Sequence, residues 1–233
     1  MTPEPEAGGA EEPSRGTADG VEVGEARWPM AGAVLAAIVL TVFMPGALRV
    51  GPRWLLPLIE GVLLVALIAG DPGKIDRRSR LLRTLSIVLV SVLVLGALLA
   101  TGQLIDDLIH GGPETNSASD LIKAGTIVWL SNNIAFALLY WELDGGGAAA
   151  RAHLLPTHHD FAFPQQLNPR IASPDWRPRF IDYLYLGFTN ATAFSPTDAM
   201  PLAPWAKIAM AVQAFVSLAI LGLVIARAVN VFA

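Results

Sequence analysis

Six polar residues cluster in a short apolar stretch near the C-terminal end of the chain. Between Asp182 and Asp198 lie 15 uncharged residues, which are too few to cross a bilayer. Side-chain oxygens gathered there either line a hydrophilic constriction or cap the backbone of a broken helix. The candidate pathway residues are Thr189, Asn190, Thr192, Ser195, Thr197 and Asp198.

A second group of polar residues interrupts the longest apolar stretches. An ionisable residue at membrane depth is costly and usually faces a cavity or a partner. Glu60 is predicted either to reach water as a hydrogen-bonded carboxyl or to bind a cation or a proton, with Arg227 as a candidate partner. Asn132, Asn133 and Gln213 are predicted to join helices by hydrogen bonds of about 1 kcal/mol each, or to line a pathway.

Charge is scarce in most of the chain. Of the 233 residues, 53% are hydrophobic and 15% are charged, against roughly 25% in a typical soluble domain. Residues 1–27 carry seven acids and two bases, whereas the other 206 residues carry 13 acids and 14 bases. This pattern excludes a basic nucleic-acid-binding protein and argues against a soluble enzyme. Without cysteine there is no thiolate metal site and no cysteine nucleophile.

Five long stretches without charge, except for Glu60, predict five membrane-spanning helices. About 20 helical residues cross a hydrocarbon core of about 30 Å. The stretches lie between residues 27 and 49, 53 and 71, 83 and 106, 123 and 142, and 207 and 227. The shorter sixth stretch predicts a helix from Phe180 to Ala193, about 20 Å long, ended by Pro196. The expected fold class is therefore all-α transmembrane, with five spanning helices plus one re-entrant, pore-type half-helix. The alternative is a sixth spanning helix that runs to about Leu202.

The charge map also predicts boundaries and orientation. We expect a disordered acidic tail over 1–27, a four-helix transmembrane region over 28–142, a polar loop over 143–179, and a pore-loop-like module over 180–233. The loop 71–83 carries five bases, so the positive-inside rule predicts that it is cytoplasmic, and with it the N-terminus. Aromatic residues near the expected span ends read as interfacial anchors, among them Trp28, Trp54, Tyr140 and Trp141.

Part of this module resembles the pore module of potassium-type channels, with its pattern F-x-T-x-T-T-V-G-Y-G-D-x-x-P. Residues 188–201 lie on the pattern without a gap, but Ser195-Pro196-Thr197 replaces Gly-Tyr-Gly. Proline has a fixed φ and no N–H, so it cannot adopt the geometry of the filter. The resemblance implies a channel-like re-entrant segment without a potassium-selective filter. In potassium-type channels this helix enters the membrane from outside, whereas the loop charges predict entry from the cytoplasm, as in glutamate-receptor pores. Either the charge count is misleading here or the module is inverted. The matching residues are Phe188, Thr192, Asp198 and Pro201.

A longer string is similar to a widespread, uncharacterised family of bacterial integral membrane proteins. It consists of YWELDGGG at 140–147, DWRPRFIDYLYLGFTNATAFSPTDAMPL at 175–202 and ARAVN at 226–230. The resemblance covers roughly the C-terminal half of the chain. It implies a multi-pass protein of the inner, cytoplasmic membrane, with no established activity.

Three functional hypotheses follow. The first is an ion-permeable, channel-like pore completed by homo-oligomerisation, since one such module cannot enclose a pore. The second is a non-conducting structural or accessory membrane protein, and the third is a small transporter that uses Glu60. The expected partners are the bilayer, further copies of the chain and inorganic ions, but not nucleic acid. No combination of nucleophile, base and orienting group is visible, so we expect no enzyme, no catalytic residue and no cofactor.

One histidine-rich tract has a spacing that does not suit a structural zinc site. It comprises His153, His158 and His159. The pattern H-x4-H-H-D differs from known zinc spacings, so we expect a polar loop there and no metal site.

Overall fold

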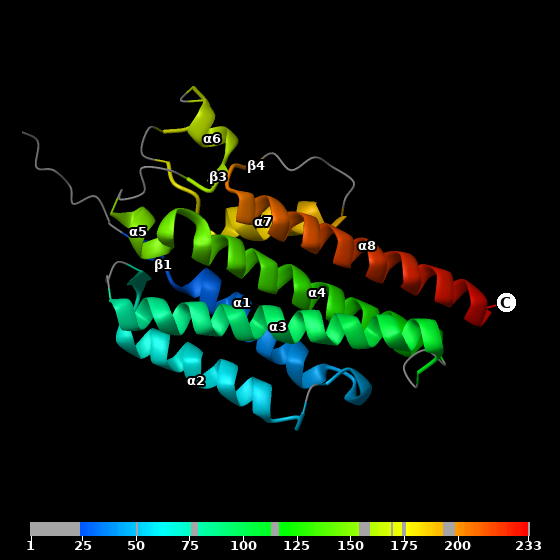
Figure 1. Ribbon diagram of the computed structural model, residues 1–233. Coiled ribbons are helices and arrows are strands. Elements are labelled where there is room, and N and C mark those ends of the chain that lie inside the picture. Colours follow the sequence, from blue (N-terminus) through cyan, green and yellow to red (C-terminus); the bar gives the residue numbers. More distant parts are fainter. Residues whose placement is uncertain are drawn as a thin grey trace, which may run out of the picture.

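The computed structural model is predominantly helical, with 78% of the described residues in helices (Figure 1). The all-α expectation is therefore confirmed. Three helices are long and apolar enough to cross a membrane, namely α3 (Arg80–His110), α4 (Ala118–Leu143) and α8 (Pro204–Phe232). The structure describes residues 24–49, 51–75, 79–112, 117–153, 159–168, 170–173, 176–192 and 199–232.

Helices α1 (Trp28–Phe43) and α2 (Leu55–Gly70) are shorter, and together with α3 and α4 they form a four-helix bundle. Each helix packs against the next in the chain, and α1 also packs against α4, so the four close into a ring. Consecutive helices run in opposite directions (Figure 1). Both short helices are apolar apart from Thr41 in α1 and Glu60 in α2. The 3-10 turn η1 (Gly46–Leu48) joins them and packs on α3.

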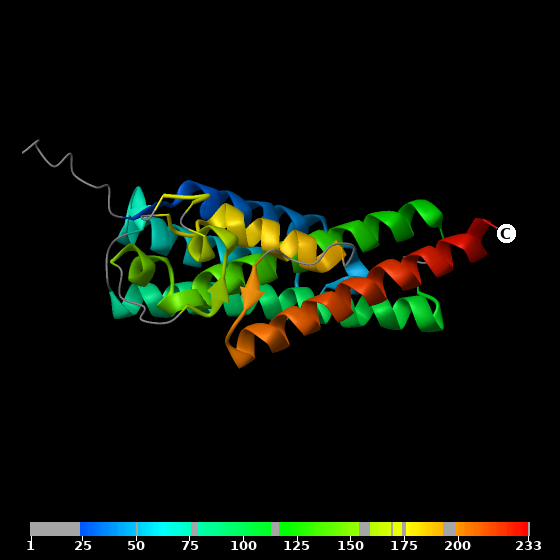
Figure 2. The same cartoon turned by 90° about the horizontal axis from the view of Figure 1, so that it is seen from above.

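Helix α7 (Phe180–Thr192) packs against α4 and α8 and has only 13 residues, about 20 Å. It begins at the same end of the bundle as α8 and runs in the same direction (Figures 1 and 2). Strand β4 (Met200–Pro201) follows α7 in the chain and lies again at this end of the bundle, where it pairs with strand β3 (Phe161–Ala162). Both ends of this segment therefore lie at one end of the bundle, which argues against a sixth helix that runs to about Leu202.

We call this end of the bundle the basic end; it carries the start of α1, the end of α2, strand β2 (Lys74–Ile75) and the start of α3. Contacts between segments far apart in the chain hold it together. Strand β1 (Glu25–Ala26) pairs with strand β2. Arg27, just before α1, forms a buried ion pair of 2.9 Å with Asp71, just after α2. The fold thus includes residues 24–27, which the charge pattern assigned to the tail. Residues 1–23 of that tail lie outside the described residues.

The segment expected to be a polar loop, 143–179, contains short elements that cover the basic end. They are the 3-10 turn η3 (Asp144–Gly146), helix α5 (Ala148–Ala152), β3, and helix α6 (Pro164–Leu167). Arg151 in α5 is buried and donates hydrogen bonds to the carbonyls of Trp141 (2.8 Å) and Asp144 (2.5 Å). The described parts of this segment are thus packed into the fold, because buried carbonyls at the end of α4 need donors.

Candidate functional site

A hydrogen-bond network joins α4, α7 and α8 at the point where α7 ends. The Asn190 amide donates to Gln213 Oε1 at 2.7 Å and to the Met210 carbonyl at 2.9 Å. The Tyr140 hydroxyl donates to the same Gln213 oxygen at 2.7 Å, and Gln213 donates to the Gly187 carbonyl at 2.9 Å. Gln213 is fully buried, so its polar atoms need these partners. The network fixes the half-length helix to two long helices.

The other candidate pathway residues on α7 use their hydroxyls within the helix itself. Thr189 Oγ1 donates to the carbonyls of Tyr185 (3.0 Å) and Leu186 (3.1 Å). Thr192 Oγ1 donates to the Thr189 carbonyl at 3.0 Å. The bond from Thr192 satisfies one of the last four carbonyls of α7, whereas those from Thr189 go to carbonyls inside the helix. The remaining candidates, Ser195, Thr197 and Asp198, lie outside the described residues.

The two asparagines of α4 face different neighbours. Asn132 donates to Thr101 Oγ1 at 2.6 Å, which joins α4 to α3, and to the Val128 carbonyl at 3.0 Å. Asn133 lies against α7, where a Cβ added to Gly187 would meet its Oδ1 at 3.1 Å. Glycine at position 187 thus lets the two helices approach closely.

The YWELDGGG segment forms a second network, at the basic end. Trp141 Nε1 donates to Glu25 Oε2 at 2.9 Å, and Glu142 accepts from Arg83 at 2.8 Å and from the Ser86 hydroxyl at 2.5 Å. A Cβ added to Gly147 would lie 1.8 Å from Arg83 Nη1, so glycine at position 147 leaves room for the guanidinium beside Glu142. Tyr140 and Trp141 are buried. Their expected role as interfacial anchors is wrong, because the Tyr140 hydroxyl binds Gln213 and the Trp141 indole N–H binds Glu25 inside the fold.

Asp144 is the centre of the same network and is fully buried. Its Oδ1 accepts from the backbone N–H groups of Asp160 (2.8 Å) and Phe161 (3.2 Å), and its Oδ2 accepts from the Tyr183 hydroxyl. The Arg151 guanidinium lies 5.1 Å from the centroid of the Tyr183 ring. Asp144 therefore connects the end of α4 with β3 and the start of α7, a structural role that its position after an apolar helix did not reveal.

Glu25 brings the N-terminal strand to the start of α7. Its carboxylate accepts from the Phe180 N–H as well as from Trp141. Burial raises the pKa of Glu25 above its ordinary value, and the two hydrogen bonds offset part of that rise.

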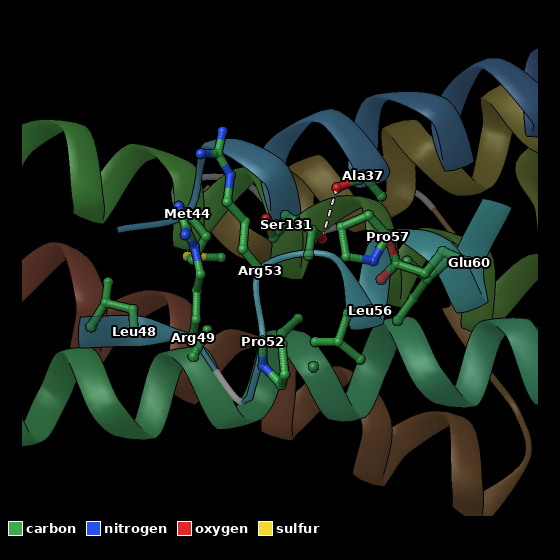
Figure 3. A pocket seen from close by; sticks show the side chains of 15 residues that line it. Ala37, Met44, Leu48, Arg49, Pro52, Arg53, Leu56, Pro57, Glu60 and Ser131 are labelled. Carbon is green, nitrogen blue, oxygen red and sulfur yellow. Dashed lines mark hydrogen bonds between the residues drawn. The ribbon is translucent and has the colours of Figure 1, made fainter. Parts of the chain in front are cut away.

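Glu60 lies on α2 in a cavity enclosed by all four helices of the bundle (Figure 3). Its side chain is 2% exposed, and its Oε2 has no hydrogen-bond partner among the described residues. Figure 3 shows Glu60 on one side of the cavity and Arg49 and Arg53 on the other. About 40 Å³ of the cavity is open to the centres of water molecules, enough for about two or three waters. The hydroxyl of Ser131, on α4, also lines the cavity and has no partner among the described residues.

Arg227, the candidate partner of Glu60, lies elsewhere. It is near the C-terminal end of α8, where its Nη2 would meet a Cβ added to Gly111 at 3.8 Å. Gly111 follows the end of α3, whereas the Glu60 cavity is lined by α3 residues Leu93 to Ala100. The expected pairing is therefore wrong, because the register of α2 and α8 cannot be read from the sequence.

A larger cavity enters the same four-helix bundle from the basic end. About 540 Å³ is open to the centres of water molecules. The wall contains two ion pairs, Arg27–Asp71 and Arg83–Glu142, and also the exposed Arg80. No local pattern in the sequence indicates this cavity, because its charged residues are spread over three separate segments.

The described residues contain no group of three or more His, Asp or Glu side chains placed to hold a metal ion. His153 and His159 are among the described residues, and His158 is not.

Comparisons of the chain with protein-family models, with curated proteins and with solved structures gave no match. Function must therefore be inferred from the geometry of the sites.

Proposed function

We propose that this chain is a multi-pass protein of the inner membrane with five spanning helices and one re-entrant half-helix. The length and composition of α3, α4 and α8 support three of the spans. Helices α1 and α2 have 16 residues each, about 24 Å, but the chain continues beyond α1 to Leu48, which is buried in a cluster with Leu104 and Leu108 near the end of α3. Trp28 and Trp54 are 71% and 62% exposed at opposite ends of this hairpin, as interfacial anchors are.

The half-helix is α7, and its direction supports a re-entrant segment. It starts at the basic end, stops beside Gln213 after about 20 Å, and is followed by a return to the same end. The basic end carries β2, the start of α3 and α5, so the positive-inside rule places it in the cytoplasm. In this orientation α7 dips into the membrane from the cytoplasmic side.

We propose further that the protein transports small ions and that Glu60 takes up and releases a proton during transport. The observation that carries this proposal is the buried Glu60 carboxylate, whose Oε2 has no partner among the described residues and adjoins a cavity with room for water. The Thr41 side chain hydrogen-bonds to the Glu60 carboxylate, but Oε2 has no partner among the described residues. Burying a carboxylate with one oxygen unpaired costs free energy, so such a group is retained where it exchanges a proton or binds an ion. Arg49 and the exposed Arg53 line the side of the cavity opposite Glu60, and this side is the proposed route of the proton to one side of the membrane.

The test is ion uptake by liposomes that contain the purified protein, measured over a range of pH. We expect uptake that varies with pH in the wild type and loses this variation in Glu60→Gln. The matched control is Asp106→Asn, which removes an exposed carboxylate from α3 outside the bundle core. Equal pH dependence in Glu60→Gln and the wild type would overturn the proposed role of Glu60.

A second candidate function is a pore built from the α7–α8 module in a homo-oligomer. The return of the chain after α7 favours it, because potassium-type channels place a half-helix before a spanning helix in the same way. Here flux would depend on Asp198 and not on Glu60, and cross-linking would trap a defined oligomer. Stable association with another membrane protein, without flux of any ion, would instead support a structural or accessory role.

A further inference from the structure

The two cavities of the four-helix bundle lie one above the other along its axis. Each is lined by residues from all four helices, and these helices form one closed ring. The two linings are seven positions apart along α1, α2 and α3, and ten positions apart along α4. These separations are about 10 Å on three helices and about 15 Å on the fourth. The residues that flank the gap are Met30 and Ala37, Glu60 and Leu67, Ser86 and Leu93, and Ser131 and Trp141.

Most of the buried material between the cavities is apolar. Each helix contributes large aliphatic side chains to the gap, among them Val34, Leu64, Leu89 and Leu138. Asn132 and Asn133 also fall between the flanking positions of α4, where Asn132 bonds to Thr101 of α3 and Asn133 lies against α7. Each of the four aliphatic residues is at most 3% exposed, and all four belong to one continuous hydrophobic cluster. A layer of this kind excludes water, because interiors packed by aliphatic side chains leave no polar space for it. We call these four residues the barrier layer.

The charges that line the cavity at the basic end favour an anion. Three arginines face two carboxylates there, and both carboxylates are already paired, Asp71 with Arg27 and Glu142 with Arg83. Among the described residues no ion pair engages Arg80, and the Nε atom of the buried Arg27 has no partner. The lining therefore has one cation more than it has anions. Such a surface attracts anions and repels cations.

The lining of the Glu60 cavity also carries a net positive charge, like that of the cavity at the basic end. Arg49 and Arg53 line it together with a single carboxylate, that of Glu60. Arg49 is half-buried, and its Nε has no partner among the described residues. The lining carries a net positive charge whether Glu60 is ionised or neutral. Rings of arginine and lysine are the means by which pores select anions.

We propose that the α1–α4 bundle encloses a path for a small inorganic anion, with the two cavities as its vestibules and the barrier layer as its closed constriction. The proposal rests on the proposed function, because it names the ion that is transported while Glu60 exchanges a proton. It places the path inside the four-helix bundle and not in the α7–α8 module.

Cysteine accessibility tests the path without any transport assay, since the chain contains no cysteine. Ser131→Cys places a thiol in the Glu60 cavity, Ala149→Cys places one in the cavity at the basic end, and Val34→Cys places one in the barrier layer. The probes are an anionic and a cationic methanethiosulfonate, each with its rate divided by its rate with a free thiol. We expect the anionic probe to be favoured about tenfold at positions 131 and 149, and neither probe to modify position 34.

A preference for the cationic probe, or none, at either vestibule position would overturn the anion assignment. Modification of Val34→Cys as fast as the vestibule positions would overturn the barrier layer. Arg53→Gln in the Ser131→Cys background is expected to lower the anion preference, because it removes one positive charge from the mouth of the vestibule.

Chloride entry into liposomes, followed with a chloride-quenched dye, tests whether the path conducts. Leu64→Ala shortens one side chain of the barrier layer, and Val65→Ala is the matched control, because Val65 is exposed on the outer face of the same helix. We expect Leu64→Ala to raise chloride entry several-fold over wild type and Val65→Ala, with potassium entry unchanged. An equal rise in potassium entry, or no rise over the control, would contradict the proposal.

The two proposals fail in different ways. If Glu60→Gln abolishes the pH dependence of transport but the vestibule cysteines show no preference for the anionic probe, the anion path is wrong and the role of Glu60 stands. If the labelling pattern is as expected but the wild type transports no ion at any pH, the proposed function is wrong and the two vestibules stand.

Discussion

The side-chain amide of Asn190, near the end of α7, donates a hydrogen bond of 2.7 Å to Gln213 Oε1, in the middle of α8. Tyr140 of α4 donates to the same oxygen, so one buried glutamine holds three helices together. This contact sets the depth that α7 reaches along α8. Asn190 thus positions the half-helix, and its role in lining a pathway stays a prediction.

Replacing Gln213 with leucine is expected to destabilise the protein by about 2–4 kcal/mol. The substitution leaves Asn190, Tyr140 and the Gly187 carbonyl without this partner, and each buried unsatisfied group costs about 1–3 kcal/mol. Thermal unfolding in detergent measures the effect. The control is Val212→Ala, which alters the neighbouring, exposed position of the same helix and is expected to shift the Tm little. Equal Tm values for the two variants would show that the network contributes nothing.

Gly147→Ala is expected to destabilise the basic end. The residue has φ 94°, where a side chain is strained, and the added Cβ would meet Arg83 Nη1 at 1.8 Å, so the guanidinium must shift away from its position beside Glu142. Because the Arg83 side chain is flexible and partly exposed, most of the cost comes from the strained backbone, about 1–3 kcal/mol. Gly222→Ala is the matched control, because no atom lies within 4 Å of its added Cβ. A Tm for Gly147→Ala as high as that of this control would contradict the packing described.

Whether a feature of the fold or of the candidate site could be predicted from the sequence depended on how far apart the contacting residues lie along the chain. Glu60 and Gln213 stand out because polar residues interrupt long apolar stretches, and the half-helix because its stretch is too short to span. Partners far apart in the chain could not be predicted, since no local pattern encodes them. Trp141 binds Glu25, which lies 116 positions away in the sequence. The acids that follow Trp141 also have distant partners, since Glu142 binds Arg83 and Asp144 binds the backbone of Asp160. The barrier layer likewise depends on the register of four helices.

Stability is expected to fall as pH rises above the ordinary pKa of Glu25, which is 4.5. Because burial raises the pKa of Glu25 in the folded state, folding favours the protonated form. The contribution is complete below pH 4.5 and is lost as pH rises through the raised pKa. Glu25→Gln removes this titration, so the Tm of the wild type should fall more than that of the variant between pH 4.5 and 8. Parallel Tm curves would show that Glu25 is not linked to folding.

Labelling of single cysteines in intact cells is expected to place the two ends of the bundle on opposite sides of the membrane. Ser117 precedes α4 at one end, and Ser79 and Ser173 lie at the basic end. A membrane-impermeant reagent should label Ser117→Cys directly, and Ser79→Cys and Ser173→Cys only after permeabilisation. Labelling of Ser79→Cys from outside would reverse the orientation. Different results for positions 79 and 173 would contradict the antiparallel pair of α3 and α4, which brings residue 173 back to the side of residue 79.

The measurement that tests the role of Glu60 most directly is the pH profile of ion uptake in liposomes with wild type, Glu60→Asp and Glu60→Gln. If Glu60 exchanges the proton, Glu60→Gln has a flat profile, and Glu60→Asp keeps a titration because it retains a carboxyl group. A profile in Glu60→Gln that matches the wild type, in protein with an unchanged Tm, would show that the buried carboxyl takes no part in transport.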